Sequence, residues 1–195
     1  MGRPICVALA DTSCDRGMTL TATATELPGV LLLAATAARD SRGSITRLSC
    51  VTTLVSLQAT FTPRQVSVSR SIRCGTLRGL HFQIPPSEET KVVHCITGAV
   101  FDVVVDLRRD SPSFCRAVCT RLSEDDNLGV MVPPGCAHGL ITLTDHVAVL
   151  YQMNADYDPA CARGVRWNDP AFDIPWPCAP TTLSPRDATW PDFVP

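Results

Sequence analysis

Residues 91–107 read KVVHCITGAVFDVVVDL, and this stretch decides the fold class. It contains two runs rich in β-branched residues, 91–96 and 99–107, with Gly98 between them. β-branched side chains favour extended backbone, and glycine between two such runs is typical of a turn. The stretch therefore predicts two consecutive strands.

Strand patterns of the same kind continue on both sides of this stretch. Turn residues separate them, among them the Pro85-Pro86 pair and the Pro-Pro-Gly run at 133–135. About eight short strands at regular spacing predict an all-β jelly roll or barrel. The predicted strands are residues 66–71, 76–83, 91–96, 99–107, 115–122, 128–132, 138–143 and 146–153.

The ends of the chain have weaker patterns. Residues 1–25 are rich in Thr, Ala and Ser without periodicity, which predicts a flexible N-terminal extension. Residues 26–33 (ELPGVLLL) predict a first strand, whereas residues 45–62 fit a strand or a short helix equally well. Beyond residue 154 the chain is punctuated by Pro and Trp, which predicts an irregular cover rather than a second domain.

Composition limits the class of protein. The 195 residues are 45% hydrophobic and 18% charged with a net charge of −2, which suits one domain with a substantial core. This near-neutral charge excludes non-specific electrostatic binding to nucleic acid or to an anionic membrane. No apolar run approaches the roughly 18 residues of a membrane span. We expect no nucleic-acid or membrane partner.

The chain has ten cysteines and one lysine. Disulfide frameworks are typical of short secreted chains, and no C-x-x-C pair occurs, so we expect reduced thiols, no zinc ribbon and a cytoplasmic location. The lysine, Lys91, stands among sixteen arginines. Lysine is a compact donor that can approach a single oxygen, whereas arginine is a wide, permanently charged fork. Chance placement explains a single lysine equally well at this point.

Polar residues concentrate in residues 75–83, GTLRGLHFQ. In a regular strand Arg78 and His81 would point to opposite faces. A bulge at Gly79 would return both to one side and form a site for an anionic substrate. An edge strand with a solvated arginine and a hydrogen-bonded histidine is the alternative.

Four further residues place polar groups on apolar strands. Asp102 and Asp106 share a face, and a buried carboxylate there needs an arginine or histidine partner. For Asp106 we expect solvation at the end of its strand. His138 follows the Pro-Pro-Gly turn at the start of a strand, and Tyr151 would place a hydroxyl on an apolar wall.

Six motifs together resemble one enzyme family. They are LRGLHFQIPP, VFDVVVDLRRDSPSF, VPPGCAHGL, VLYQM, RGVRWNDPAFDIPWP and LSPRD. In their order and spacing, from residue 26 to residue 193, they resemble the dTDP-4-dehydrorhamnose 3,5-epimerases. The resemblance implies a single domain over residues 26–195, an all-β cupin jelly roll with a few short peripheral helices. It also implies a homodimer, a nucleotide-sugar substrate and no metal or other cofactor.

The resemblance also implies which residues do the chemistry. The family inverts carbons beside the 4-keto group of a nucleotide-linked 6-deoxyhexose through an enolate. His81 matches the base, Asp187 the carboxylate that orients it, and Tyr151 the acid on the opposite face of the sugar. Lys91 would stabilise the O4 anion. The substrate-binding residues implied are Arg42, Arg47, Gln65, Ser67, Arg78, Lys91, His138, Tyr157 and Arg186.

The motif of metal-binding cupins is only partly present. That motif resembles G-x5-H-x-H-x3-4-E-x6-G, and here His81 is followed by Gln83 where a second histidine would stand. Lys91 stands where the pattern has its glutamate. An ammonium repels a divalent cation, so the ligand set is too poor for stable metal binding.

The chain departs from the family's pattern at three positions. Arg47 and Ala162 stand where rhamnose-pathway members usually have glutamate, and Ser44 replaces an aromatic residue. The nucleotide, the hexose and the choice of C3, C5 or both therefore stay open. Two other functions compete: a metal-dependent cupin oxygenase or isomerase, and a non-catalytic sugar-nucleotide binder. The joint presence of the four catalytic residues argues against the binder.

Overall fold

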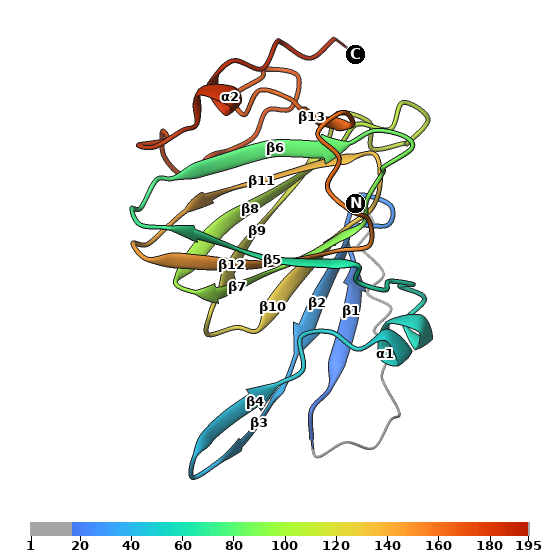
Figure 1. Cartoon of the computed structure of the whole chain (residues 1–195), viewed down its shortest axis with the longest axis vertical. Coiled ribbons are helices and arrows are strands. Elements are labelled where there is room, and N and C mark those ends of the chain that lie inside the picture. Colours follow the sequence, from blue (N-terminus) through green and yellow to red (C-terminus); the bar gives the residue numbers. More distant parts are fainter. Residues whose placement is uncertain (1–16, 195) are drawn as a thin grey trace, which may run out of the picture.

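The computed structural model describes residues 17–194, which form a β-sandwich with a small hairpin projecting from it (Figure 1). Its helices are α1 (Val51–Ser56) and α2 (Pro185–Ala188). Its strands are β1 (Leu20–Ala24), β2 (Leu31–Ala35), β3 (Ala37–Asp40), β4 (Gly43–Thr46), β5 (Gln65–Ser71), β6 (Leu77–Gln83), β7 (Lys91–Thr97), β8 (Ala99–Asp106), β9 (Ala117–Ser123), β10 (Leu128–Val132), β11 (Cys136–Thr142), β12 (Val147–Met153) and β13 (Ala162–Gly164).

Two antiparallel sheets make the sandwich. The six-stranded sheet has the order β1-β2-β10-β7-β12-β5, and the five-stranded sheet has the order β13-β6-β11-β8-β9. Strands β3 and β4 form the separate hairpin that projects from the sandwich in Figure 1. Apart from the β1–β2 and β8–β9 pairs, neighbouring strands in each sheet are not consecutive in sequence, as in a jelly roll. The predicted all-β jelly roll with short peripheral helices is confirmed.

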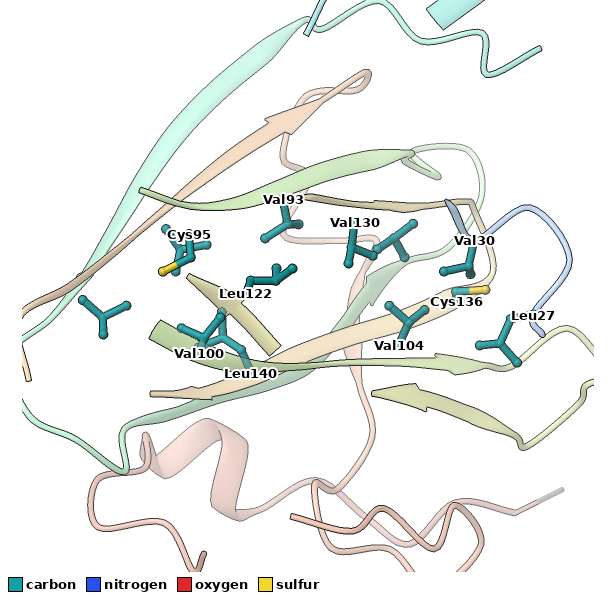
Figure 2. Packing of buried hydrophobic residues seen from close by; sticks show 13 residues of the cluster. Leu27, Val30, Val93, Cys95, Val100, Val104, Leu122, Val130, Cys136 and Leu140 are labelled. Atoms are coloured by element: carbon teal, nitrogen blue, oxygen red, sulfur yellow. The ribbon is translucent and has the colours of Figure 1, made fainter. Parts of the chain in front are cut away.

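The main core lies between the two sheets (Figure 2). Strand alternation builds it: on β7, Val93 and Cys95 point inward, whereas Val92 joins a second cluster on the outer face. The inner cluster comprises Leu27, Val30, Val93, Cys95, Val100, Val104, Leu122, Val130, Val132, Cys136, Leu140, Val147 and Val149. These side chains hold the sheets together and leave the opposite edge of the sandwich open for polar residues.

Both outer faces of the sandwich are partly covered by segments outside the sheets. Leu54, Leu57 and Phe61, from α1 and the residues after it, pack on the outer face of the six-stranded sheet. The C-terminal segment packs Val165 and Phe172 on the outer face of the five-stranded sheet. This C-terminal segment is the irregular cover that the Pro/Trp pattern predicted.

The eight strands predicted from residue 66 onward agree with the structure within two residues, but the short strand β13 was not predicted. Two predictions nearer the N-terminus are wrong. The flexible extension does not reach residue 25, because β1 pairs with β2 and buries Leu20 and Ala22. The first strand predicted over 26–33 is instead a turn followed by β2, which begins at Leu31. Residues 1–16 of the extension lie outside the described part of the chain.

Residues 45–62, which the sequence left open, divide between the end of β4, the short helix α1 and irregular backbone. The eight cysteines among residues 17–194 are free thiols. Over the same residues, the structure has no helix with the length and apolarity needed to cross a membrane.

The prediction for Asp106 is wrong as well. Its side chain is completely buried and accepts hydrogen bonds from Arg108 Nε at 2.7 Å and from the hydroxyls of Ser111 and Ser113. Burial alone would raise the pKa of Asp106, but these hydrogen bonds outweigh it and hold the pKa well below its ordinary value. The loop that follows β8 folds back over the strand end and excludes the solvent we expected there.

His94 is a buried histidine on the outer face of the six-stranded sheet. Its ring lies over Gly129 of the neighbouring strand, where a Cβ would come within 2.3 Å of Nε2. Neither ring nitrogen has a hydrogen-bond partner in the described chain. Burial therefore lowers the pKa of His94 from 6.5 to about 4.

This burial makes folding sensitive to acid. Between pH about 6.5 and about 4 the unfolded chain binds a proton at His94 that the folded chain does not, so the free energy of unfolding falls as the pH falls. Between pH 7 and pH 5 the free energy of unfolding should fall by about 2 kcal/mol less in His94→Leu than in the wild type, measured by urea unfolding at both pH values. His146→Asn, at an exposed histidine with φ 54° that asparagine tolerates, is the control and should leave the loss unchanged. An unaltered acid loss in His94→Leu would contradict the assignment.

Candidate active site

A cavity of about 430 Å³ opens between the two sheets, on the side where β5 ends one sheet and β6 and β13 end the other. Strands of both sheets and helix α2 line it. All but two of the residues predicted for the site lie on its wall. They are His81, Tyr151, Asp187, Lys91, Gln65, Ser67, Arg78, His138, Tyr157 and Arg186.

An irregularity in β6 brings Arg78 and His81 to the same cavity. His81 pairs with His138 and Arg78 pairs with Leu140, so three steps along β6 match two along β11. The extra residue falls at Gly79, whose φ of +134° is open to glycine but strained for other residues. The bulge predicted from the sequence is confirmed. Of the edge-strand alternative, the exposed arginine and the hydrogen-bonded histidine are present, but β13 pairs with β6 over residues 81–83, so β6 is not an edge strand there.

His81 is held by a buried carboxylate. Its Nε2 lies 2.6 Å from Oδ1 of Asp187, which is 4% exposed. Ser184 begins α2 and accepts a hydrogen bond from the Asp187 backbone, which fixes the carboxylate in place. Burial raises the pKa of Asp187, but the His81 contact outweighs this, and the net pKa is lowered. With Nε2 facing the carboxylate, Nδ1 is the ring nitrogen left to exchange a proton with a ligand.

A second histidine–carboxylate pair lies deeper in the cavity. His138 Nε2 is 2.7 Å from Oδ2 of Asp102, and both side chains are almost fully buried. Asp102 thus has the histidine partner that its place on an apolar strand called for. The His138 ring also meets the Tyr151 ring edge-on, with centroids 6.0 Å apart. The deep end of the cavity therefore has fixed geometry.

Tyr151 keeps its proton in this setting. Burial, with a smaller contribution from the nearby Asp102 charge, raises the pKa of Tyr151 well above its ordinary value. A phenol in this state is a hydrogen-bond donor at neutral pH. Its hydroxyl is thus available to donate a hydrogen bond to a ligand.

Five polar residues of the cavity wall were missed as site residues by the sequence analysis: Ser69, Gln83, Glu89, Arg163 and Ser184. Glu89 lies 2.9 Å from Lys91 Nζ, and the signal was its place two residues before the only lysine, on the same side of an extended chain. Gln83, noted only as a substitution in the metal motif, donates to the backbone oxygens of Ser87 and Asp156. It also accepts from the Asp158 backbone at 2.7 Å. Its amide is therefore occupied in bracing the two loops at the cavity mouth.

Arg42 and Arg47 are the two predicted residues that the structure does not bring to this cavity. Arg42 lies at the tip of the β3–β4 hairpin, where it pairs with Asp40 at 2.6 Å and is 87% exposed. The hairpin points away from the sandwich (Figure 1). The described chain therefore does not place these arginines at this cavity.

Comparison with known proteins agrees with the motifs. A family model described as dTDP-4-dehydrorhamnose 3,5-epimerase matches residues 24–194, nearly all of the described chain. The chain belongs to this family. The resemblance inferred from six sequence motifs is therefore confirmed.

Individual relatives of this family member are similar over most of the sandwich. The dTDP-4-dehydrorhamnose 3,5-epimerase of Sinorhizobium fredii is 41% identical over 130 residues, which is 66% of this chain and about two thirds (67%) of that protein. A dTDP-4-dehydrorhamnose 3-epimerase of Streptomyces niveus is 42% identical over 123 residues, 63% of this chain and 59% of that protein.

One solved structure aligns with a larger share of this chain than these relatives do. The Bacillus anthracis dTDP-4-dehydrorhamnose 3,5-epimerase, solved with TDP and PPi bound, has a TM-score of 0.86 at 37% identity. The alignment covers 89% of this chain and 99% of that one. The epimerase family member described here thus has the whole fold of that enzyme.

The close approach at Gly79 gives a test of the site's scaffold. An alanine Cβ there would come within 2.5 Å of the Gly139 Cα, whereas Gly43 has nearly the same φ and nothing within 4 Å. We expect Gly79→Ala to lower the free energy of unfolding by about 2 kcal/mol more than Gly43→Ala, because only the former forces backbone apart. Urea unfolding measures both. Equal losses would show that conformation alone, not strand contact, requires glycine at 79.

Proposed function

We propose that this protein epimerises C3, C5 or both carbons of a nucleotide-linked 4-keto-6-deoxyhexose, by proton abstraction and reprotonation through an enolate. The observation that carries this is the single cavity that holds the His81–Asp187 pair, Lys91 and the protonated Tyr151. Deprotonation beside a carbonyl needs a base, an enolate stabiliser and an acid on the opposite face. In this proposal His81, Lys91 and Tyr151 fill these three roles.

His81 is the proposed base. It takes the proton from the carbon beside the carbonyl, and the electron pair of the C–H bond moves to O4 as an enolate. Asp187 stabilises the imidazolium that forms and keeps the ring oriented. A neutral imidazole has one ring nitrogen free to accept a proton, so the ring can act as a base.

Lys91 and Tyr151 serve the other two needs. The Lys91 ammonium lies on the cavity wall, where it can donate a hydrogen bond to O4 as negative charge develops. Tyr151 then delivers its proton to the opposite face of the sugar, which inverts the carbon, and regains a proton from solvent. The carbonyl is part of the substrate, so the reaction needs no redox cofactor and no metal.

The nucleotide end of the substrate suits the cavity mouth. Arg78 and Arg186 supply guanidinium groups for a diphosphate, and Tyr157 is an exposed aromatic ring for stacking on the base. The backbone of Tyr157 donates to Gln65 Oε1 at 3.1 Å, which ties the ring to β5 beside Ser67. His138 lies at the sugar end. The eight free thiols support a reducing compartment, and we propose a cytoplasmic location.

We further propose a homodimer in which the β3–β4 hairpin delivers Arg42 and Arg47 to the partner's cavity. Two observations support it. The hairpin of a single protomer has no contact with that protomer's cavity. The outer face of β5 exposes Val66 (60%) and Val68 (45%), an apolar surface that a second copy would cover.

Deuterium exchange tests the reaction. Incubation of the protein with dTDP-4-keto-6-deoxyglucose in deuterated water should place deuterium at the inverted carbons, and NMR locates it at C3, C5 or both. His81→Asn should lower the rate of this exchange by about 10²–10⁴-fold, because no other base faces that side of the sugar. A folded His81→Asn protein that still exchanges would remove His81 from the role. Activity that depends on added metal would favour the oxygenase or isomerase alternative, and binding without exchange would favour the non-catalytic binder.

Tyr151→Phe distinguishes proton transfer on the two faces of the sugar. The variant keeps the ring and its packing but loses the only acid proposed for the opposite face. His81 should then return deuterium to the starting configuration, so inversion falls by about 10²–10⁴-fold while deuterium incorporation falls much less. Both rates come from one NMR sample. An equal fall in the two rates would show that Tyr151 is not the acid.

Subunit mixing tests the role of Arg42. Arg42→Ala and His81→Asn homodimers should each be impaired, but a mixed dimer has one cavity with its own His81 and the partner's intact Arg42. Random mixing by co-refolding should restore roughly a quarter of wild-type activity, because half of the dimers are mixed and each has one complete site. Refolding each variant alone is the control. Absence of recovery in a confirmed mixed dimer would contradict shared sites.

A further inference from the structure

Lys91 and Glu89 form a buried ion pair on the cavity wall. Lys91 Nζ lies 2.9 Å from Glu89 Oε1, and the two side chains are 10% and 11% exposed. Both residues line the same cavity as His81 and Tyr151. A buried ammonium and carboxylate remain charged only when each has the other or an equivalent partner. The pair therefore holds a lysine ammonium inside the cavity before any ligand enters.

The Glu89 carboxylate is itself held in place. Its second oxygen, Oε2, lies 3.5 Å from Gln83 Nε2. Gln83 is 4% exposed and is tied by hydrogen bonds to the backbone of both loops at the cavity mouth. Lys91, by contrast, reaches the cavity on a flexible four-carbon stem. The glutamate thus lies between a fixed amide and the ammonium, whereas the ammonium lies at the end of a flexible stem.

We propose that Glu89 is a positioning residue, which acts through Lys91 and does not touch the sugar. An ammonium has three N–H donors in fixed tetrahedral directions. One donor goes to Glu89, so the directions of the other two are set, and they are left to point into the cavity. The inference rests on the proposed function, because the oxygen that these donors would meet is O4 of the 4-keto sugar.

The energetic consequence falls on the transition state. The ground-state carbonyl oxygen is a weak acceptor, whereas the enolate oxygen carries charge and gains most from a donor already in place. A displaced ammonium would still permit binding but would meet the enolate at the wrong distance. Loss of Glu89 should thus lower kcat and leave KM nearly unchanged. A misplacement of about 1 Å in such a contact can cost on the order of 10²-fold.

The chain offers a matched control and a probe of a single residue. Glu88 is the same residue type one position away, is exposed, and has no hydrogen bond or ion pair within the described residues. Lys91 is the only lysine, so expression with ¹³Cε-labelled lysine gives one lysine signal in an NMR spectrum. That signal reports directly on the surroundings of the ammonium, with or without turnover.

The experiment compares Glu89→Ala, Glu89→Gln and Glu88→Ala with the wild type. In Glu89→Ala we expect kcat to fall at least about 10-fold with KM within about 3-fold, and the Lys91 signal to move. Glu89→Gln keeps an oxygen that can accept from Lys91, so its kcat should lie between those of the wild type and Glu89→Ala. Glu88→Ala should match the wild type in kcat and in the Lys91 signal.

Each outcome decides between roles. A kcat for Glu89→Ala within about 3-fold of wild type, or an unmoved Lys91 signal, overturns the proposal. A rise in KM without a fall in kcat would place Glu89 in substrate binding and would also overturn it. If the wild type itself shows no deuterium exchange, the proposed function fails, whereas the Lys91 signal still tests whether Glu89 sets the place of the ammonium. Glu89→Gln preserves the shape of the side chain, so the test stands even if Glu89→Ala fails to fold.

Discussion

The close contact between β6 and β11 is the constraint on which the site depends. At Gly79 and Gly139 the two backbones meet with no room for a Cβ on either strand. This contact admits the extra residue in β6, and the extra residue turns both Arg78 and His81 toward the cavity. The same turn leaves the Gly79 N–H 3.4 Å from Oδ2 of Asp187. One irregular step in a strand therefore aligns a guanidinium, an imidazole and the carboxylate that holds it.

Around this contact the protein handles buried charge by strict pairing. Asp102 meets His138, Asp187 meets His81, Glu89 meets Lys91, and Asp106 meets Arg108. At least one member of each of the first three pairs lines the cavity, whereas neither member of the fourth does. A carboxylate inside a sandwich is costly unless its partner is also fixed, so these pairs are structural before they are chemical. The charged side chains of the cavity therefore have protein partners and do not depend on water for hydrogen bonds.

Much of the fold, and the bulge at the site, could be predicted from local sequence patterns. The strands from residue 66 onward follow from β-branched runs and turn residues, and the bulge follows from one glycine between two polar residues. The misses have a common cause, which is that the deciding contact is remote in sequence. Leu20 and Ala22 form a strand only because β2 lies beside them. Asp106 is buried only because Ser111 and Ser113 fold back over it. Neither contact leaves a periodic signal in its own segment.

The carboxylate that orients His81 comes from α2, more than a hundred residues further along the chain. Ribosomes make the sandwich strands first and this short helix near the end of the described residues. The His81 imidazole is therefore synthesised long before the carboxylate that contacts it, and the two meet only in the tertiary structure. The core on the outer face of the five-stranded sheet also takes side chains from the C-terminal segment, so the same last part of the described chain completes both this core and the proposed catalytic pair.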